Sequence, residues 1–198
     1  MPEPIHWIRD PKKIAALGSP VRQRLLDRLE ALGPASVREL AASLSVPPDR
    51  LYYHVRILER VGVVQAVGSR GAGREEEVEY DLFARRWHIA YEPSDADNRA
   101  AVERLTAAML RQAGRDFEAG FDHEGVAVRG RARNLWSLRL EASLTRAELR
   151  ELNDHLQAIV ALLRKPRRRA GGAPCALTWV LAPLALGDAD ASAAGGAS

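Results

Sequence analysis

The sequence predicts an α+β protein, with a helix-turn-helix and a β-hairpin in its N-terminal part and a smaller α+β unit after them. Apolar residues first recur at helical spacing between turn residues and then form two short runs around a glycine-rich turn. The 198 residues, 46% of them hydrophobic, supply enough apolar material for packed cores. We expect domains at residues 1–92 and 93–186 and a disordered tail at 187–198.

Two helices are expected between residues 11 and 32. Gly18 interrupts the helical pattern, and Ser19 with Pro20 suits an N-cap followed by the first helical position. The apolar positions, three or four residues apart, predict one buried face: Ile14, Leu17, Val21, Leu25 and Leu29.

The next two helices are expected to form a helix-turn-helix. Ser36 and Glu39 have the spacing of a capping box, which opens a short helix ending at Leu44. After a tight turn, Pro47 and Pro48 open a helix with a single apolar stripe. That stripe consists of Leu51, Val55 and Leu58.

A β-hairpin is predicted directly after this helix. Residues 63–67 and 78–83 have strand character, and residues 68–73 form a turn-rich tip. Trp87, Ile89 and Tyr91 alternate with more polar residues and predict one more strand. A hairpin in this position is the wing of a winged helix.

The C-terminal half is expected to mix helices and strands. An amphipathic helix is predicted over residues 95–121 and strands over 136–144 and 173–186. A second capping box, Thr145 with Glu148, opens a helix with a leucine-rich seam. The seam, which suits either a dimer interface or an intrachain core, consists of Leu149, Leu152, Leu156, Ile159 and Leu163.

The exposed face of the 47–60 helix is mostly cationic. Between Arg50 and Arg74 the chain has five arginines against one acidic residue, Glu59. Arginine pairs bidentately with guanine in the major groove, and tyrosine can bond a phosphate or cover a thymine methyl. We therefore predict DNA contacts by Ser36, Arg38, Asp49, Arg50, Tyr52, Tyr53, His54, Arg56, Arg60, Arg70 and Arg74. Arg50 and Tyr53 are assigned to bases, Arg56 and Arg60 to phosphates.

The wing has features that both favour and oppose DNA binding. Arg70 and Arg74 lie on its tip, where they can reach the minor groove. The acidic residues that follow would repel phosphate unless the returning strand turns them away. They are Glu75, Glu76, Glu77, Glu79 and Asp81.

The order and spacing of these elements resemble those of ArsR-type winged-helix repressors. The resemblance covers residues 10–83 and is specific as a combination, although each piece is short. The matching pieces are Ile14 to Arg22, Val37 to Ala41, Leu51 to Val55, Leu58 and Val61 to Val64. The resemblance implies a homodimer, operator binding by the 47–60 helix, and a signal that releases or tightens DNA.

No metal site or cofactor is expected. Metal-sensing members of that family often have a Cys-x-Cys motif at the position of residues 38–44, whereas Cys175 is the only cysteine here. The five histidines include no pair three or four residues apart, and the cluster at residues 122–124 is interpreted as a polar loop. Zinc or nickel sensing stays open as a third interpretation.

An apolar effector pocket is a weaker hypothesis than an ordinary aromatic core. Its candidate residues are Trp87, Tyr91, Phe117, Phe121, Trp136 and Trp179. An enzyme is not expected, because the sequence lacks the GxSxG, HExxH, P-loop and dinucleotide-binding motifs.

The function we expect is a cytoplasmic homodimeric repressor. It would read a palindromic double-stranded DNA operator with the 47–60 helix and the 68–74 wing, and it would have no contact with membranes, since no apolar stretch is long enough to span one. The alternative is a winged-helix protein-interaction module whose acidic 75–81 strand binds a basic partner.

Overall fold

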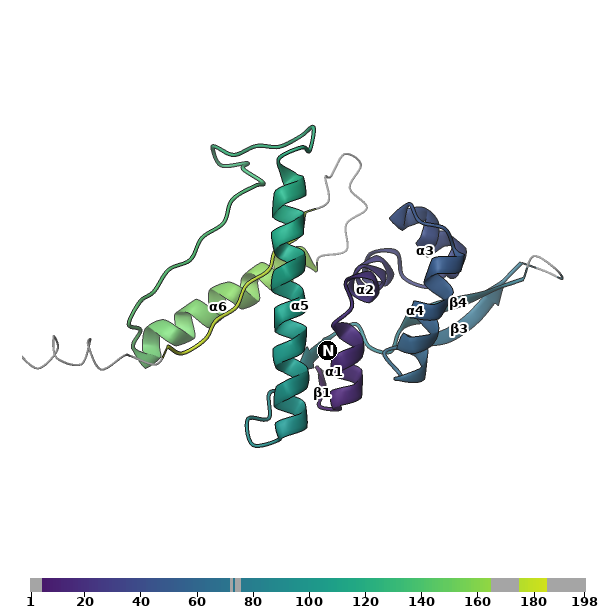
Figure 1. Ribbon diagram of the computed structural model, residues 1–198, viewed down its shortest axis with the longest axis horizontal. Coiled ribbons are helices and arrows are strands. Elements are labelled where there is room, and N and C mark those ends of the chain that lie inside the picture. Colours follow the sequence, from purple (N-terminus) through teal and green to yellow (C-terminus); the bar gives the residue numbers. More distant parts are fainter. Residues whose placement is uncertain (1–4, 72, 74–75, 165–174, 185–198) are drawn as a thin grey trace, which may run out of the picture.

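The computed structural model describes residues 5–71, 73, 76–164 and 175–184 (Figure 1). Its helices are α1 (Pro11–Leu17), α2 (Pro20–Leu32), α3 (Val37–Leu44), α4 (Asp49–Arg60), α5 (Ala96–Gly120) and α6 (Arg146–Leu163). Its strands are β1 (His6–Ile8), β2 (Ala35–Ser36), β3 (Val64–Arg70), β4 (Glu77–Leu82) and β5 (Trp87–Ile89). The predicted class is confirmed, and all these strands lie before residue 90.

The helix boundaries follow from local capping. The Asp10 side chain accepts a hydrogen bond of 2.8 Å from the Lys12 amide at the start of α1. The capping box at α3 is confirmed, because Ser36 and Glu39 each satisfy a backbone amide of the other. Ser45 ends α3 in the left-handed region at φ 54°, which turns the chain toward α4.

The wing is an antiparallel hairpin in a three-stranded sheet of order β2-β4-β3. The register shifts between Ala66 and Gly68, so Val67 forms a bulge. Strand β3 continues to Arg70, which makes the tip shorter than the predicted residues 68–73. Arg70 therefore lies opposite Glu77 of β4 and has a fixed position in the sheet.

The predicted strand at Trp87 and Ile89 is confirmed, but its partner was not predicted. Strand β5 pairs in parallel with β1, with Trp7 opposite His88. The N-terminal residues therefore lie beside the segment that follows the wing. A strand of three residues has too little alternation to be recognised in the sequence.

A single hydrophobic cluster connects the winged helix with the first half of α5. Ile14, Leu25 and Leu58 are fully buried in it, and Ala101 and Leu105 of α5 belong to the same cluster. In Figure 1, α5 runs beside α1, against which it packs. The domain boundary near residue 93 stays a prediction. The hydrophobic cluster contains residues from both sides of it, because α5 packs against α1.

Two predicted C-terminal strands are wrong in the described part of the chain. Residues 136–144 and 175–184 have no regular secondary structure. A half-buried strand requires both a hydrogen-bonded neighbour and a covering core, and Leu138 and Leu140 are 66% and 78% exposed. The apolar residues do alternate in this segment, but none of the described strands pairs with it. The tail at 187–198 lies outside the described residues.

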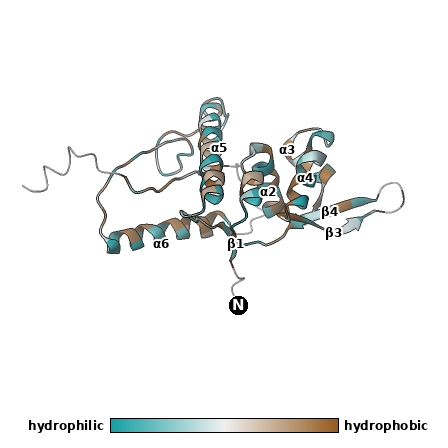
Figure 2. Cartoon of the chain, turned by 60° about the horizontal axis from the view of Figure 1, so that its bottom comes forward, coloured by the Kyte–Doolittle hydropathy of each residue, from teal (hydrophilic) through white to brown (hydrophobic). Residues whose placement is uncertain are grey.

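Helix α6 begins where predicted and stands apart from the core. Thr145 and Glu148 form the capping box, and the helix has no buried residue. Figure 2 shows hydrophobic and hydrophilic residues alternating along it. An ion pair of 3.2 Å joins Arg164, just after α6, to Glu30 of α2. The leucine seam is therefore exposed at its ends, at Leu149 and Leu163, and partly buried at Leu152, Leu156 and Ile159.

Candidate nucleic-acid interface

Helix α4 presents a cationic face with a tyrosine near its centre. Leu51, Val55 and Leu58 anchor the opposite face in the core. The predicted contact residues on the outer face are all exposed: Asp49, Arg50, Tyr52, Tyr53, Arg56 and Arg60. Tyr53 is 67% exposed, and Arg50, Arg56 and Arg60 form no ion pair within the described residues. Their guanidinium groups are thus available to an outside partner.

His54 lies on the flank of this face and differs from its neighbours. Its Nδ1 is buried without a hydrogen-bond partner among the described residues. Its ring meets the Tyr53 ring edge-on, with centroids 5.4 Å apart. Burial, and then the nearby Arg22 guanidinium, hold the pKa of His54 below its ordinary value of 6.5. His54 is accordingly neutral at pH 7.

The described acidic residues of the returning strand have partners within the protein. Arg38 of α3 forms an ion pair with Glu77 at 2.8 Å. Arg70 pairs with Glu39 of α3 at 2.9 Å and also with Glu79 of β4. These contacts connect the wing to α3 through charges, so the acidic strand does not present a bare negative surface to phosphate.

Two more contacts complete this arrangement. The Asp81 carboxylate accepts a hydrogen bond of 2.6 Å from Arg85, whose guanidinium also donates to the Leu29 carbonyl. Glu76 accepts one from Ser69 across the hairpin. The acidic residues of this strand were the sequence feature that argued against DNA binding. In the structure, arginine or serine side chains contact Glu76, Glu77, Glu79 and Asp81.

The predicted contact residues outside α4 differ in accessibility. Ser36 is 4% exposed, and its hydroxyl is occupied in the capping box. Arg70 keeps a 66% exposed side chain despite its two carboxylate partners. Arg74 lies outside the described residues. The face of α4 therefore contains most of the accessible candidates.

The six aromatic candidates for an effector pocket do not come together around a cavity. Phe117 and Phe121 stack edge-on with centroids 5.4 Å apart, and Trp87 packs against the core. Tyr91, Trp136 and Trp179 are 69%, 55% and 40% exposed. Trp136 instead lies under the Arg133 guanidinium, 3.9 Å from its ring centre.

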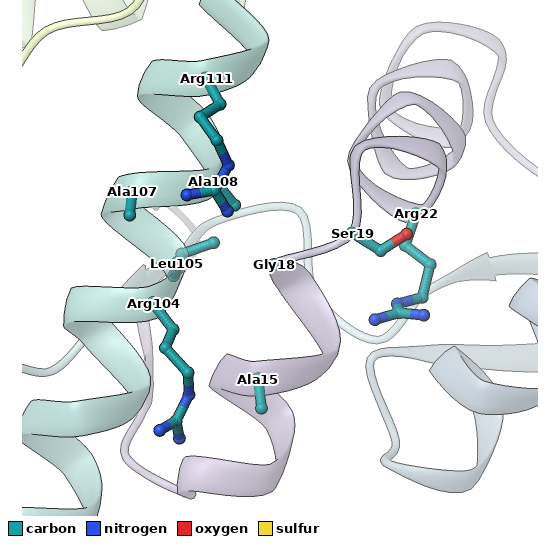
Figure 3. Close-up of a pocket in the computed structure, with 9 residues that line it drawn as sticks. All are labelled: Ala15, Gly18, Ser19, Arg22, Arg104, Leu105, Ala107, Ala108 and Arg111. Carbon is teal, nitrogen blue, oxygen red and sulfur yellow. The ribbon is translucent and has the colours of Figure 1, made fainter.

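A cleft that the sequence did not reveal lies between the α1–α2 turn and α5. It measures about 360 Å³, and its arginines come from two elements far apart in the sequence (Figure 3). Arg104 and Arg111 lie two turns apart on α5, with Ala107 and Ala108 between them. This spacing of long cationic and small residues is the only sequence signal, and many solvated helix faces share it.

Among the described residues, no three histidine, cysteine, aspartate or glutamate side chains lie close enough to hold a metal ion. None of the helices described is long and apolar enough to cross a membrane.

Comparison with known proteins supports the helix-turn-helix. A family model described as a helix-turn-helix domain matches residues 17–65, from the end of α1 to the start of β3. No curated protein sequence is significantly similar to this chain. Residues 17–65 therefore form a helix-turn-helix domain, and nothing in the match distinguishes the ArsR type from other winged-helix types.

Solved structures give similarities of low identity. A transcriptional regulator homologue from Pyrococcus horikoshii is 24% identical over 51% of this chain and 88% of its own, with a TM-score of 0.31. The multiple antibiotic-resistance repressor MarR from Listeria monocytogenes is 17% identical over 77% and 81%, with a TM-score of 0.29. A Mycobacterium tuberculosis MarR family protein, solved with p-aminosalicylic acid, is 21% identical over 76% and 88%, with a TM-score of 0.27. These similarities do not identify the function of this chain.

Proposed function

We propose that this chain is a cytoplasmic DNA-binding transcriptional regulator that acts as a homodimer, with repression as its default effect. The observation that supports this most is the outer face of α4, where exposed arginines and Tyr53 lie side by side and the arginines form no ion pair with any described residue. In a helix-turn-helix the second helix lies in the major groove with its N-terminal residues at the bases. Helix α4 is that second helix.

The proposed division of roles follows the position of each side chain along α4. Arg50 and Tyr53 lie in its N-terminal half, nearest the base edges, and Arg56 and Arg60 lie toward its C-terminal end. Base contacts carry sequence preference, whereas phosphate contacts fix the register. The wing residue Arg70 is proposed to act mainly through its pairs with Glu39 and Glu79, which hold the hairpin beside α3.

Dimerisation is proposed because one winged helix offers a limited interface, while a two-fold operator needs two copies one helical turn apart. The seam of α6 supports it, since no residue of that helix is buried within one chain. Leu149 and Leu163 are 40% and 56% exposed, so a second copy could cover them.

The alternative function, an acidic strand that binds a basic protein, is less well supported. Glu77, Glu79 and Asp81 already have arginine partners in the same chain. A basic partner would have to replace these internal pairs, whereas the arginines of the α4 face form no ion pair within the described part of the chain.

The test is a binding measurement on fluorescent duplex DNA from upstream of the gene that encodes the protein. The titration is run at two salt concentrations, with an unrelated duplex as competitor. We expect specific binding that weakens steeply with salt, because several arginines displace condensed counterions. Failure to bind at low salt, by a protein shown to be folded and dimeric, would favour the protein-interaction alternative.

A further inference from the structure

Residues 136–144 form an exposed apolar segment between the loop after α5 and the start of α6. Every residue in it is exposed, and Leu138 and Leu140 are 66% and 78% exposed. None of the described strands pairs with it, and its backbone forms no hydrogen bond with any described residue. In Figure 1 it is the open stretch of chain that runs down to the start of α6. Its amides, its carbonyls and an apolar surface are therefore available to an outside partner.

The segment has an apolar face and a polar face. Arg139 and Glu141 form an ion pair although they are two residues apart, which fits an extended backbone with both side chains on one side. The apolar residues occupy the alternate positions 136, 138, 140, 142 and 144. Successive side chains of a strand point to opposite faces, so this is the pattern of a strand with one apolar side. Within one chain, none of the described strands lies beside it.

Two copies of this segment complement each other when they lie antiparallel with their Leu140 residues opposite. Residues directly opposite in an antiparallel pair share a face and interact most strongly. In this register Arg139 of each copy lies opposite Glu141 of the other, so two ion pairs form across the two-fold axis. The other opposite pairs are serine with serine, leucine with alanine and tryptophan with leucine: 137 with 143, 138 with 142 and 136 with 144.

Neighbouring registers are less favourable. Centring the pair on Arg139 would place the two arginines opposite each other, and centring it on Glu141 would do the same with the two glutamates. A shift that places Leu140 opposite Arg139 would mix the apolar and polar faces. The charge pattern therefore selects one register, and that register is symmetric. A self-complementary strand indicates a second copy of the same chain as its partner rather than an unrelated protein.

We infer that residues 137–143 pair in antiparallel fashion with the same residues of a second copy, with the two-fold axis at Leu140. The inference deepens the proposed function by naming a contact of the homodimer, and it rests on that function only in requiring two copies. It also gives a reason for the strand-like alternation of a segment that forms no strand within one chain.

Helix α6 stabilises this contact in the inferred dimer. An isolated ribbon of two strands is marginally stable in water, so its apolar face needs a cover. Helix α6 begins at Arg146, directly after the segment, and its leucine seam is the nearest apolar surface along the chain. The ribbon and the two α6 helices would therefore form one continuous interface between the copies.

The first test is disulfide cross-linking of single-cysteine variants. All carry C175S, because the native Cys175 is exposed. The two Leu140 Cα atoms should lie about 4.5–5.5 Å apart, within the range that a disulfide spans. L140C should therefore form a covalent dimer under mild oxidation at least about tenfold faster than L138C, whose two Cα atoms would be about 14 Å apart. A mixture of L138C and A142C should cross-link to each other, because these positions lie opposite.

The second test is charge reversal, measured by sedimentation without DNA. R139E would place two glutamates opposite each other at both ends of the axis, so the dimer dissociation constant should rise by about fivefold or more. R139E/E141R restores opposite charges and should recover the wild-type value. R131E makes the same change in net charge outside the paired segment and should leave the dimer unchanged.

The outcomes separate this inference from the proposed function. A wild-type dimer in which L140C cross-links no faster than L138C would overturn the inference and leave the homodimer in place. Equal dissociation constants for the wild type and R139E would do the same. A protein that is monomeric throughout would overturn both. Rapid cross-linking of L140C in a protein that fails to bind its upstream DNA would support the inference and count against DNA binding.

Discussion

At the scale of single residues, α4 separates base contacts from phosphate contacts. Replacing Arg50 by alanine should cost about 1–3 kcal/mol on the preferred operator and relax the preference at one base pair. Replacing Arg56 should weaken all sequences about equally and reduce the slope of affinity against salt by about one counterion. Both side chains are exposed, so neither change should alter folding.

The measurement is a binding titration of each variant against a set of operator duplexes with single base-pair changes, at three salt concentrations. The same loss of selectivity from both variants would contradict the division of roles. Arg60, on the same face one turn after Arg56, serves as a second phosphate-type control.

His54 predicts a pH dependence of folding. Its pKa is lower in the folded protein than the ordinary 6.5, so the unfolded chain binds more protons as the pH falls through 6.5. The contribution of His54 to the free energy of unfolding should therefore decrease from pH 7.5 toward the lower folded pKa, so the wild type should lose more stability than H54N over this range.

Urea denaturation at several pH values measures this effect. The control is H155N, since the side chain of His155 is 73% exposed on α6. A wild-type protein and an H54N variant with parallel pH profiles would show that His54 is equally easy to protonate in both states.

At the scale of elements, the wing is held to α3 by exposed ion pairs rather than by a core. The variant R70A should lower the free energy of unfolding by about 1–3 kcal/mol, because it leaves the Glu79 carboxylate, whose side chain is only 16% exposed, without its arginine partner. Amide hydrogen exchange in β3 and β4 near the tip should nevertheless become faster. R99A, which breaks a comparably exposed pair on α5, should leave wing exchange unchanged.

The sequence predicted helices and hairpin well because their signals are local. The spacing around Gly18, the capping boxes at Ser36 and Thr145, and the turn before α4 each lie within a few residues. The strand expected at 136–144 was wrong, since alternation states which residues share a face but not whether a neighbouring strand exists. The pairing of β1 with β5 was not predicted for the same reason.

The candidate site, too, was predictable from the sequence only where its signals are local. The exposed face of α4 follows from helical periodicity, so its residues could be named from the sequence. The partners of Glu77 and Glu79 come from α3 and β3, and the cleft joins α1, α2 and α5. Contacts between distant segments need the tertiary structure, and the sequence alone left the acidic strand unexplained.

At the scale of the whole molecule, the partly exposed seam of α6 predicts the oligomeric state. The double variant L152D/L156D should turn a dimer into a monomer in sedimentation velocity while keeping its helical circular dichroism, because Leu152 and Leu156 are partly, not fully, buried within one chain. A161D adds a charge to the opposite face of the same helix and should remain dimeric. A dimer that persists in L152D/L156D would place the interface elsewhere.

The buried Asn98 side chain connects α5 to the segments that follow β1 and β5. The Asn98 amide donates to the carbonyls of Arg9 and Ala90, 3.1 and 3.2 Å away, and accepts from the Glu92 amide at 3.0 Å. This residue of α5 thereby fastens together the exits of β1 and β5, and stretching any of these bonds would leave a buried polar group without a partner. The first half of α5 is fixed by Asn98 and by the packing of Ala101 and Leu105 in the core, whereas no residue of this helix after Ala108 is buried. A force applied to the C-terminal end of α5 would therefore be transmitted along a rigid helix to its contact with α1.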